Sequence, residues 1–145
     1  MANLLRLIGM KYIFTKNFAK HWASIPFIWI MLVPVILVHI TTELYHQVCF
    51  RLYGVDLVDS KIYFNFDRSK LNYLSSLDKL NCGYCTYVNG TFSYISEIGR
   101  RTEYYWCSIK HNNQPNNPAF AYQEKFAPYG DKDAFESIRS SRGKK

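Results

Sequence analysis

The sequence predicts a mainly α-helical protein in which one N-terminal transmembrane helix precedes a small helical domain clamped by a metal ion. Two observations lead to this prediction. The chain of 145 residues contains an uncharged, strongly apolar run from Trp22 to Thr42. Further along, three cysteines and one histidine occur at spacings typical of a four-ligand metal site.

The apolar run is long enough to cross a bilayer. A hydrocarbon core of about 30 Å needs roughly 20 residues in helical form, and residues 22–42 carry no formal charge. Apolar side chains surround the whole circumference, whereas a soluble helix keeps one face polar. We therefore predict a transmembrane helix and its extension over residues 22–50. Pro34 should kink this helix or mark a contact with another membrane helix.

Residues 1–21 form a basic leader without an acidic residue. Its apolar positions alternate with Arg6, Lys11, Lys16 and Lys20, which suits a short amphipathic helix on an anionic membrane surface. The leader can equally be a flank that only orients the span. A cleaved signal peptide fits less well, because the apolar run exceeds the core of roughly 7 to 15 residues found in such peptides.

The rest of the chain divides into a globular domain, residues 51–138, and a disordered basic tail, residues 139–145. Leucines three residues apart predict an amphipathic helix over residues 67–80. A second helix is expected within residues 86–110, weakened by an asparagine and two glycines. Asp131 is the predicted N-cap of a short last helix.

The pattern C-x2-C, x21, C-x3-H predicts one metal site formed by Cys82, Cys85, Cys107 and His111. Zinc suits a closed tetrahedral set of three thiolates and one imidazole, in which no position remains for substrate. Iron held by thiolates is the alternative metal. Two readings without metal stay open: the cysteines form disulfides, or Cys107 is simply buried while His111 is exposed.

The flanking charges and the cysteine pattern favour opposite membrane orientations. Four basic residues before the span, against Arg51 and Lys61 soon after it, place the N-terminus in the cytoplasm. That orientation exports the domain to a compartment where C-x2-C oxidises. Because a reduced metal site is easier to keep in the cytosol, we expect a single-pass protein of the cell inner membrane with its metal module on the cytoplasmic side.

A second polar set lies at the end of the span, where His39, Glu43 and His46 share one helix face. Glu-x-x-His on a helix also contributes ligands to carboxylate-bridged metal centres, although one helix supplies too few of them. Ionisable groups near a membrane face a protein partner, a cavity or the interface. The simpler interpretation is that these side chains mark the emergence of the helix into the headgroup region.

The segments "ELYHQVCF", "KLNCGYC", "YVNG", "TEYYWCSIKH" and "YGDKDAF" occur together over most of residues 24–135. In this combination the chain resembles a group of small bacterial single-span membrane proteins of unassigned function. The resemblance implies one span and a small cytoplasmic-type module with the CxxC…CxxxH pattern. It implies no activity and no catalytic residue.

Composition and motifs argue against catalysis and against nucleic-acid binding. The sequence has no phosphate-binding glycine loop, no HExxH and no nucleophile and base at a familiar spacing. The net charge of +7 is dispersed and suits anionic lipid. We expect a membrane-anchored accessory or assembly subunit whose structural zinc module docks on a larger integral membrane complex. The alternatives are a redox or electron-transfer protein with an iron-thiolate site or reactive CxxC pair, and a metalloenzyme subunit that uses the second polar set.

Overall fold

The computed structural model describes residues 18–113 and 118–142, and within these ranges the chain is mainly helical. Turns and loops join the helices, together with an isolated β-bridge between Ile109 and Ala127. The predicted fold class is confirmed at this level: a mainly helical chain with one N-terminal helix long and apolar enough to span a membrane. The leader before residue 18 and the last three residues of the predicted tail lie outside the described residues.

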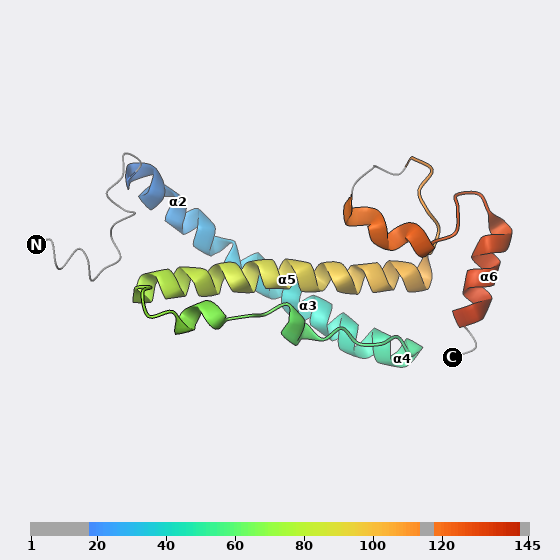
Figure 1. Ribbon diagram of the computed structural model, residues 1–145, viewed down its shortest axis with the longest axis horizontal. Coiled ribbons are helices and arrows are strands. Elements are labelled where there is room, and N and C mark those ends of the chain that lie inside the picture. Colours follow the sequence, from blue (N-terminus) through green and yellow to red (C-terminus); the bar gives the residue numbers. More distant parts are fainter. Residues whose placement is uncertain (1–17, 114–117, 143–145) are drawn as a thin grey trace, which may run out of the picture. The chain divides into compact units, whose positions relative to one another are not determined.

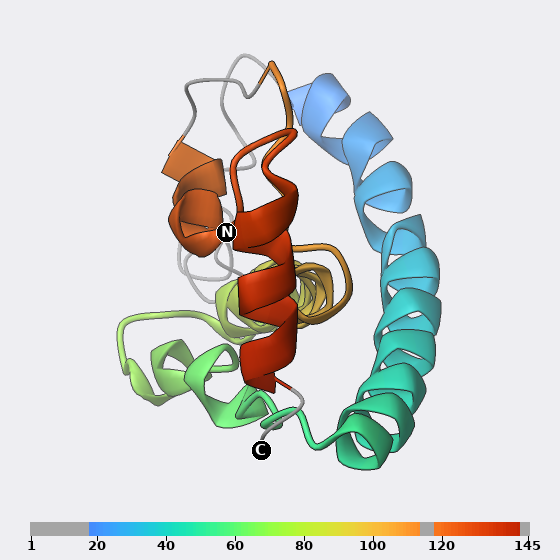
Figure 2. The same ribbon diagram turned by 90° about the vertical axis from the view of Figure 1, so that its right-hand side faces the viewer.

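The apolar helix covers Ala23–Tyr53 and is interrupted where the sequence places Pro34. Helix α2 (Phe18–Ile30) and helix α3 (Leu32–Tyr45) are separated by a one-residue turn (Figure 1). Proline has no amide hydrogen to donate to the carbonyl four residues earlier, here that of Ile30, and its ring crowds that oxygen. The predicted kink is therefore confirmed, and Figure 2 shows the resulting curve of this helix.

After α3 the helix continues as a π-helix, η1 (His46–Phe50), and then as the short helix α4 (Arg51–Tyr53). π-turns are rare and often lie at functional sites, because they change the direction of the side chains that follow. The helix ends at Gly54, whose φ of 65° lies in the left-handed region that glycine adopts without a steric penalty.

Helix α5 (Ser76–Trp106) replaces the two helices that the sequence predicts in this region. The predicted helix over residues 67–80 is wrong in its bounds, because only the 3-10 turn η3 (Asp67–Lys70) forms before α5 begins. The start of α5 is fixed by a reciprocal cap: the Ser75 hydroxyl accepts the Asp78 amide, and the Asp78 carboxylate accepts the Ser75 amide.

No break occurs near Gly90, where the sequence suggested one. A Cβ atom at this position would lie 2.5 Å from the backbone oxygen of Tyr63 and 2.9 Å from the ring of Phe64. The glycine costs the helix about 1 kcal/mol in intrinsic propensity. Here it permits the returning chain to lie directly against α5, and this packing offsets the cost.

The last helix, α6 (Lys132–Arg142), confirms the predicted cap, since Asp131 Oδ1 accepts the amide of Ala134 at 2.9 Å. It extends into the region predicted as a disordered tail. The segment between α5 and α6 contains, in its described part, the 3-10 helix η4 (Pro118–Lys125).

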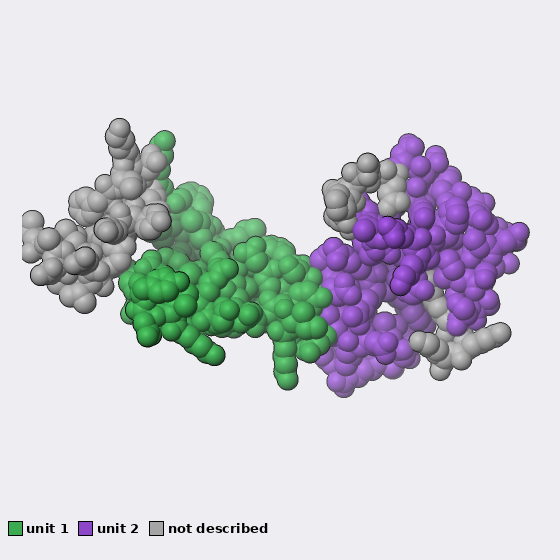
Figure 3. All heavy atoms as spheres, in the orientation of Figure 1, with its two compact units in different colours: residues 1–45, 59–95 green, residues 46–58, 96–145 purple. Residues whose placement is uncertain are grey.

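The chain forms two compact units that interleave along the sequence (Figure 3). Unit 1 comprises residues 1–45 and 59–95, and unit 2 comprises residues 46–58 and 96–145. Among the described residues, unit 1 buries Val35 and Tyr94, whereas the apolar residues buried in unit 2 are Phe50, Val58, Ile98, Phe126 and Ala127. The boundary predicted at residue 51 from composition does not follow this division, because helix α5 contributes to both units.

Candidate functional site

The main polar cluster of unit 1 lies between α3 and α5. His39 Nδ1 and the Tyr87 hydroxyl are 3.0 Å apart, and the two ring centroids are separated by 5.7 Å. Phe64, from the loop before α5, stacks on His39 at 5.5 Å with an interplanar angle of 17°, and its ring centroid also lies 6.0 Å from that of Tyr87. The three rings therefore form one cluster, in which the imidazole contacts two aromatic rings and one hydroxyl of the same chain.

One helical turn further along α3, the Tyr94 hydroxyl donates to Glu43 Oε2 at 2.6 Å. Only 1% of the Tyr94 side chain is exposed. Burial raises the pKa of the Tyr94 hydroxyl, and the hydrogen bond and negative charge of Glu43 raise it further. The phenol therefore stays protonated at neutral pH and remains the donor to this carboxylate.

The two tyrosines belong to one face of α5, on which Tyr84, Tyr87, Thr91 and Tyr94 follow at helical spacing. The Tyr84 hydroxyl donates to the backbone oxygen of Ile28 at 2.6 Å. The Thr91 hydroxyl is buried and has no hydrogen-bond partner among the described residues. The spacing of three and four residues between these side chains could have indicated from the sequence which face of α5 is packed. The sequence does not show which helix this face contacts.

His46, the third member of the second polar set, belongs to unit 2. Its Nε2 accepts the backbone amide of Val58 at 2.9 Å, and its ring packs edge-on against Phe50 at 4.8 Å. The side chain is fully buried. His46 therefore supports the loop after α4, and Nε2, already an acceptor, is not directed at a ligand.

The four predicted metal ligands are not brought together by the described residues. Cys82 and Cys85 lie one turn apart within α5, whereas Cys107 directly follows the last residue of this helix and His111 comes after it. An α-helix rises about 1.5 Å per residue, so the helix between Cys85 and Cys107 has a length of roughly 30 Å. No group of three or more His, Cys, Asp or Glu side chains in the described ranges is arranged to hold an ion.

The reason for this outcome is the uninterrupted α5. The prediction used the local spacings C-x2-C and C-x3-H, and these say nothing about the conformation of the residues between them. A single Cys3His site needs that segment to fold back, whereas α5 extends it. The zinc or iron site therefore stays a prediction. All four cysteines of the chain, including Cys49, are free thiols in the structure.

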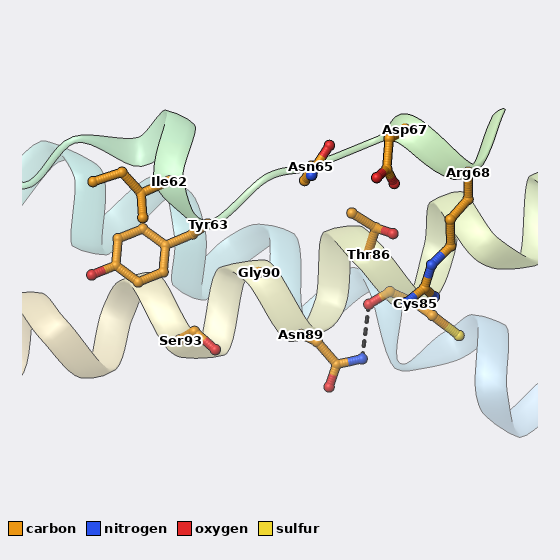
Figure 4. A pocket seen from close by; sticks show the side chains of 10 residues that line it. All are labelled: Ile62, Tyr63, Asn65, Asp67, Arg68, Cys85, Thr86, Asn89, Gly90 and Ser93. Carbon is orange, nitrogen blue, oxygen red and sulfur yellow. Dashed lines mark hydrogen bonds between the residues drawn. The ribbon is translucent and has the colours of Figure 1, made fainter. Parts of the chain in front are cut away.

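Cys85 lines an open hollow of about 570 Å³ within unit 1 (Figure 4). One wall is α5, on which the side chain of Asn89 donates to the backbone oxygen of Cys85 at 2.8 Å. The other wall is the loop before η3 and η3 itself, from which Arg68 extends toward α5. The lining is polar and open to solvent, with no buried charged group that would fix a ligand.

Unit 2 carries a separate network around Glu103. The Tyr122 hydroxyl and the Gln123 amide both donate to its carboxylate, and Gln123 is 1% exposed. The Arg100 guanidinium lies 5.2 Å from the centroid of the Tyr122 ring. Burial raises the pKa of the Tyr122 hydroxyl, and the hydrogen bond to Glu103 adds to this effect. Every member of this network is used in joining η4 to α5.

Comparisons with known proteins give no family and no relative. No family matches the chain, no curated protein matches it, and no solved structure resembles its fold. The resemblance to small bacterial single-span proteins therefore stays a prediction.

Proposed function

We propose that the protein is a membrane-bound, non-enzymatic accessory or assembly subunit that docks on a larger integral membrane complex. The observation that carries the proposal is the state of its apolar helix. Only 6% of the most apolar window of this helix is buried within the protein. Burying an exposed leucine or isoleucine side chain contributes about 1.5–3 kcal/mol, so this helix needs a cover of lipid or of a partner's membrane helices.

The internal pairing of the polar side chains supports a scaffold rather than a reaction site. His39 and Glu43 are engaged by Tyr87 and Tyr94, and these bonds fix α5 against the apolar helix. A metalloenzyme subunit needs such ligands directed toward an open position. In this chain they are directed at tyrosine hydroxyls, which favours a structural role.

Zinc remains part of the proposal as a cofactor of the module that contains Cys82, Cys85, Cys107 and His111. Its binding requires a change in α5 that brings the two halves of the ligand set together. Elemental analysis and an absorption spectrum of the purified chain test this directly. One colourless zinc per chain supports the site, a red iron-thiolate band favours the redox alternative, and a metal-free chain that keeps its fold contradicts both.

The redox alternative has one specific observation in its favour: the thiols of Cys82 and Cys85 lie one helical turn apart and Cys85 is exposed. Thiol–disulfide exchange needs an accessible thiolate. Titrating the chain against glutathione buffers measures the potential of this pair. A pair that cycles near the cellular potential would favour this alternative over the accessory role.

The test of the accessory role uses the full chain, tagged after Lys145 and expressed at its natural level. After solubilisation in a mild detergent, native mass spectrometry should show the chain bound to a larger integral membrane protein. The Leu44→Ser, Val48→Ser variant is measured beside the wild type. It makes the exposed apolar face more polar and leaves His39 and Glu43 unchanged. A chain that is monomeric in every mild detergent, or that fractionates with soluble proteins, would contradict the proposal.

A further inference from the structure

The apolar helix is not exposed evenly around its circumference. In unit 1, a narrow stripe that includes Trp29, Val35, His39 and Glu43 packs against the rest of the chain. The remaining surface carries large apolar side chains from the last turn of α2 to the end of α3: Phe27, Ile30, Met31, Val33, Leu37, Val38, Ile40 and Leu44, each between 46% and 77% exposed. The stripe contacts the rest of unit 1, and the broad apolar face is free to contact an apolar partner or lipid.

The segment that covers the stripe carries charged residues that are exposed to solvent. Phe64 of this segment stacks on His39. Lys61 and Asp67, each three residues from Phe64, are both exposed and belong to the short 3-10 helix η2 (Ser60–Ile62) and to η3. Since an extended chain covers at most about 3.6 Å per residue, the Cα atoms of Lys61 and Asp67 lie within roughly 11 Å of the Phe64 Cα. Charged residues and irregular backbone therefore lie beside α3.

This arrangement is costly if the helix crosses the bilayer. Irregular backbone exposed to lipid leaves unsatisfied amide and carbonyl groups, which does not occur in the hydrocarbon region. Charged side chains near the middle of the membrane are also expensive. A helix that crosses with residues 22–42 has its centre near residue 32. The contacts of Tyr84 with Ile28 and of Phe64 with His39 would then bring α5 and the charged loop into the bilayer beside it. A helix that lies in the plane of the interface keeps them all on the water side.

We infer that α2 and α3 lie along the surface of an anionic bilayer, with their broad apolar face in the acyl boundary and unit 1 above it. This inference rests on the proposed membrane-bound role and adds the mode of attachment. The net charge of +7 and the acid-free leader, with Arg6, Lys11, Lys16 and Lys20, complement anionic headgroups. The occupant of the apolar face is thus lipid rather than a partner helix.

An interfacial helix normally has a strongly polar face of its own, and α2 and α3 have little of this kind. Here the polar face is supplied by other parts of unit 1. Tyr84, Tyr87 and Tyr94 of α5 and Phe64 of the loop cover the stripe. The same two segments carry exposed polar side chains such as Asn65 and Asn89. A helix that is apolar all round therefore suits the interface when protein covers one side of it.

The test is the membrane depth of three exposed positions in the full chain. Phe27, Leu37 and Leu44 are each replaced by a spin-labelled amino acid through codon suppression, which leaves the native cysteines in place. The variants are reconstituted into vesicles of phosphatidylcholine and phosphatidylglycerol. Accessibility to oxygen and to a water-soluble nickel chelate then gives the depth of each label.

An interfacial helix places the three labels at similar depths, about 5–10 Å below the headgroups. A spanning helix separates Phe27 from Leu44 by about 25 Å along the bilayer normal, with Leu37 the deepest or intermediate. That result would overturn the inference and leave the membrane-bound role standing. Labels exposed to the chelate at all three positions, on a chain that does not sediment with vesicles, would overturn both.

A second measurement does not depend on the variants. Epitope tags at the two ends of the wild-type chain are tested for protease protection in spheroplasts and in inverted membrane vesicles. The inferred attachment leaves both tags on one side of the membrane. Tags on opposite sides contradict it.

Discussion

The two units are held together by different kinds of polar contact. Unit 1 joins side chains far apart in the sequence, with His39 bound to Tyr87 and Glu43 bound to Tyr94. Unit 2 also joins distant segments, but it uses a partly exposed ion pair: Arg101 pairs with Glu97 on α5 at 3.0 Å and donates to the carbonyls of Asp56 and Leu57 in the loop after α4.

The difference indicates how each unit meets its surroundings. The bonds of unit 1 hold an apolar helix whose outer face is not covered by any of the residues that the structure describes, so this unit needs an apolar environment. Unit 2 uses charged pairs that are partly exposed and that water solvates well, such as Glu97 with Arg100 and Arg101. Four substitutions with matched controls test this contrast.

The largest effect is expected from Gly90→Ala in unit 1. The new methyl group would lie 2.5 Å from the Tyr63 carbonyl oxygen, which is backbone and cannot rotate away. Separating the loop from α5 should lower the free energy of unfolding by about 2–3 kcal/mol. The measurement is chemical unfolding of the full chain in mild detergent.

Gly99→Ala is the matched control in unit 2. No atom lies within 4 Å of its new methyl group, so the gain in helix propensity should raise the stability by about 0.5–1 kcal/mol. Equal effects of the two substitutions would show that the loop is not packed against α5.

Tyr94→Phe should have the second largest effect, because it removes a donor from the Glu43 carboxylate inside unit 1. A lost hydrogen bond to a charged group costs about 2 kcal/mol, whereas Tyr87→Phe, which acts on a histidine, should cost about 1 kcal/mol. Adding Glu43→Gln to Tyr94→Phe should restore part of the stability, since an amide is cheaper to bury than a carboxylate. Failure of this rescue would contradict the role assigned to Glu43.

Arg101→Ala tests the contacts that join α5 to the loop after α4 in unit 2. It removes the bonds to the carbonyls of Asp56 and Leu57 and to the Glu97 carboxylate, and should lower the stability by about 1 kcal/mol. Lys132→Ala breaks an ion pair with Glu136, in which the two side chains are 81% and 61% exposed. This change should alter the free energy of unfolding by less than about 0.5 kcal/mol. Similar losses in both variants would mean that Arg101 acts only through surface charge.

The smallest effect is a pH dependence in unit 2. The pKa of the Tyr122 hydroxyl is raised above its ordinary value of 10.0, so its stabilising contribution is complete below pH 10 and is lost as the pH rises through the higher folded value. The difference in unfolding free energy between the wild type and Tyr122→Phe should shrink above pH 10. Tyr129→Phe, at an exposed position, is the control and should leave the curve unchanged. A difference that stays constant up to pH 12 would refute the assignment.

Features fixed by local chemistry could be predicted from the sequence. Pro34 interrupts the apolar helix at Ile30, and Asp131 caps α6, because each acts on backbone groups a few residues away. The continuity of α5 could not be predicted, because Gly90 is required by Tyr63, a residue outside the helix. In the same way, the partners of His39 and Glu43 lie 48 and 51 residues further along, and no local pattern connects them.

The cysteine pattern shows the limit of spacing as evidence. C-x2-C and C-x3-H each describe a pair that local structure can hold, but a site also needs the pairs to meet. The structure places a continuous helical segment between Cys85 and Cys107. A motif separated by residues with good helix-forming periodicity should therefore be tested first for an uninterrupted helix.

The π-turn at His46–Phe50 also bears on the history of the chain. A π-turn accommodates one residue more than the α-helical turn it replaces, so it is what a single-residue insertion leaves in a helix whose two ends are already anchored. Here the first end is held by Glu43 and by the bond from Val58 to His46, and the second end is fixed by the turn at Gly54. Related chains that lack one residue in this segment should keep an ordinary α-helix there, with the aromatic ring that now packs on His46 moved by about 100° around the axis. Removing Gln47 or Val48 would recreate such an ancestor in the laboratory.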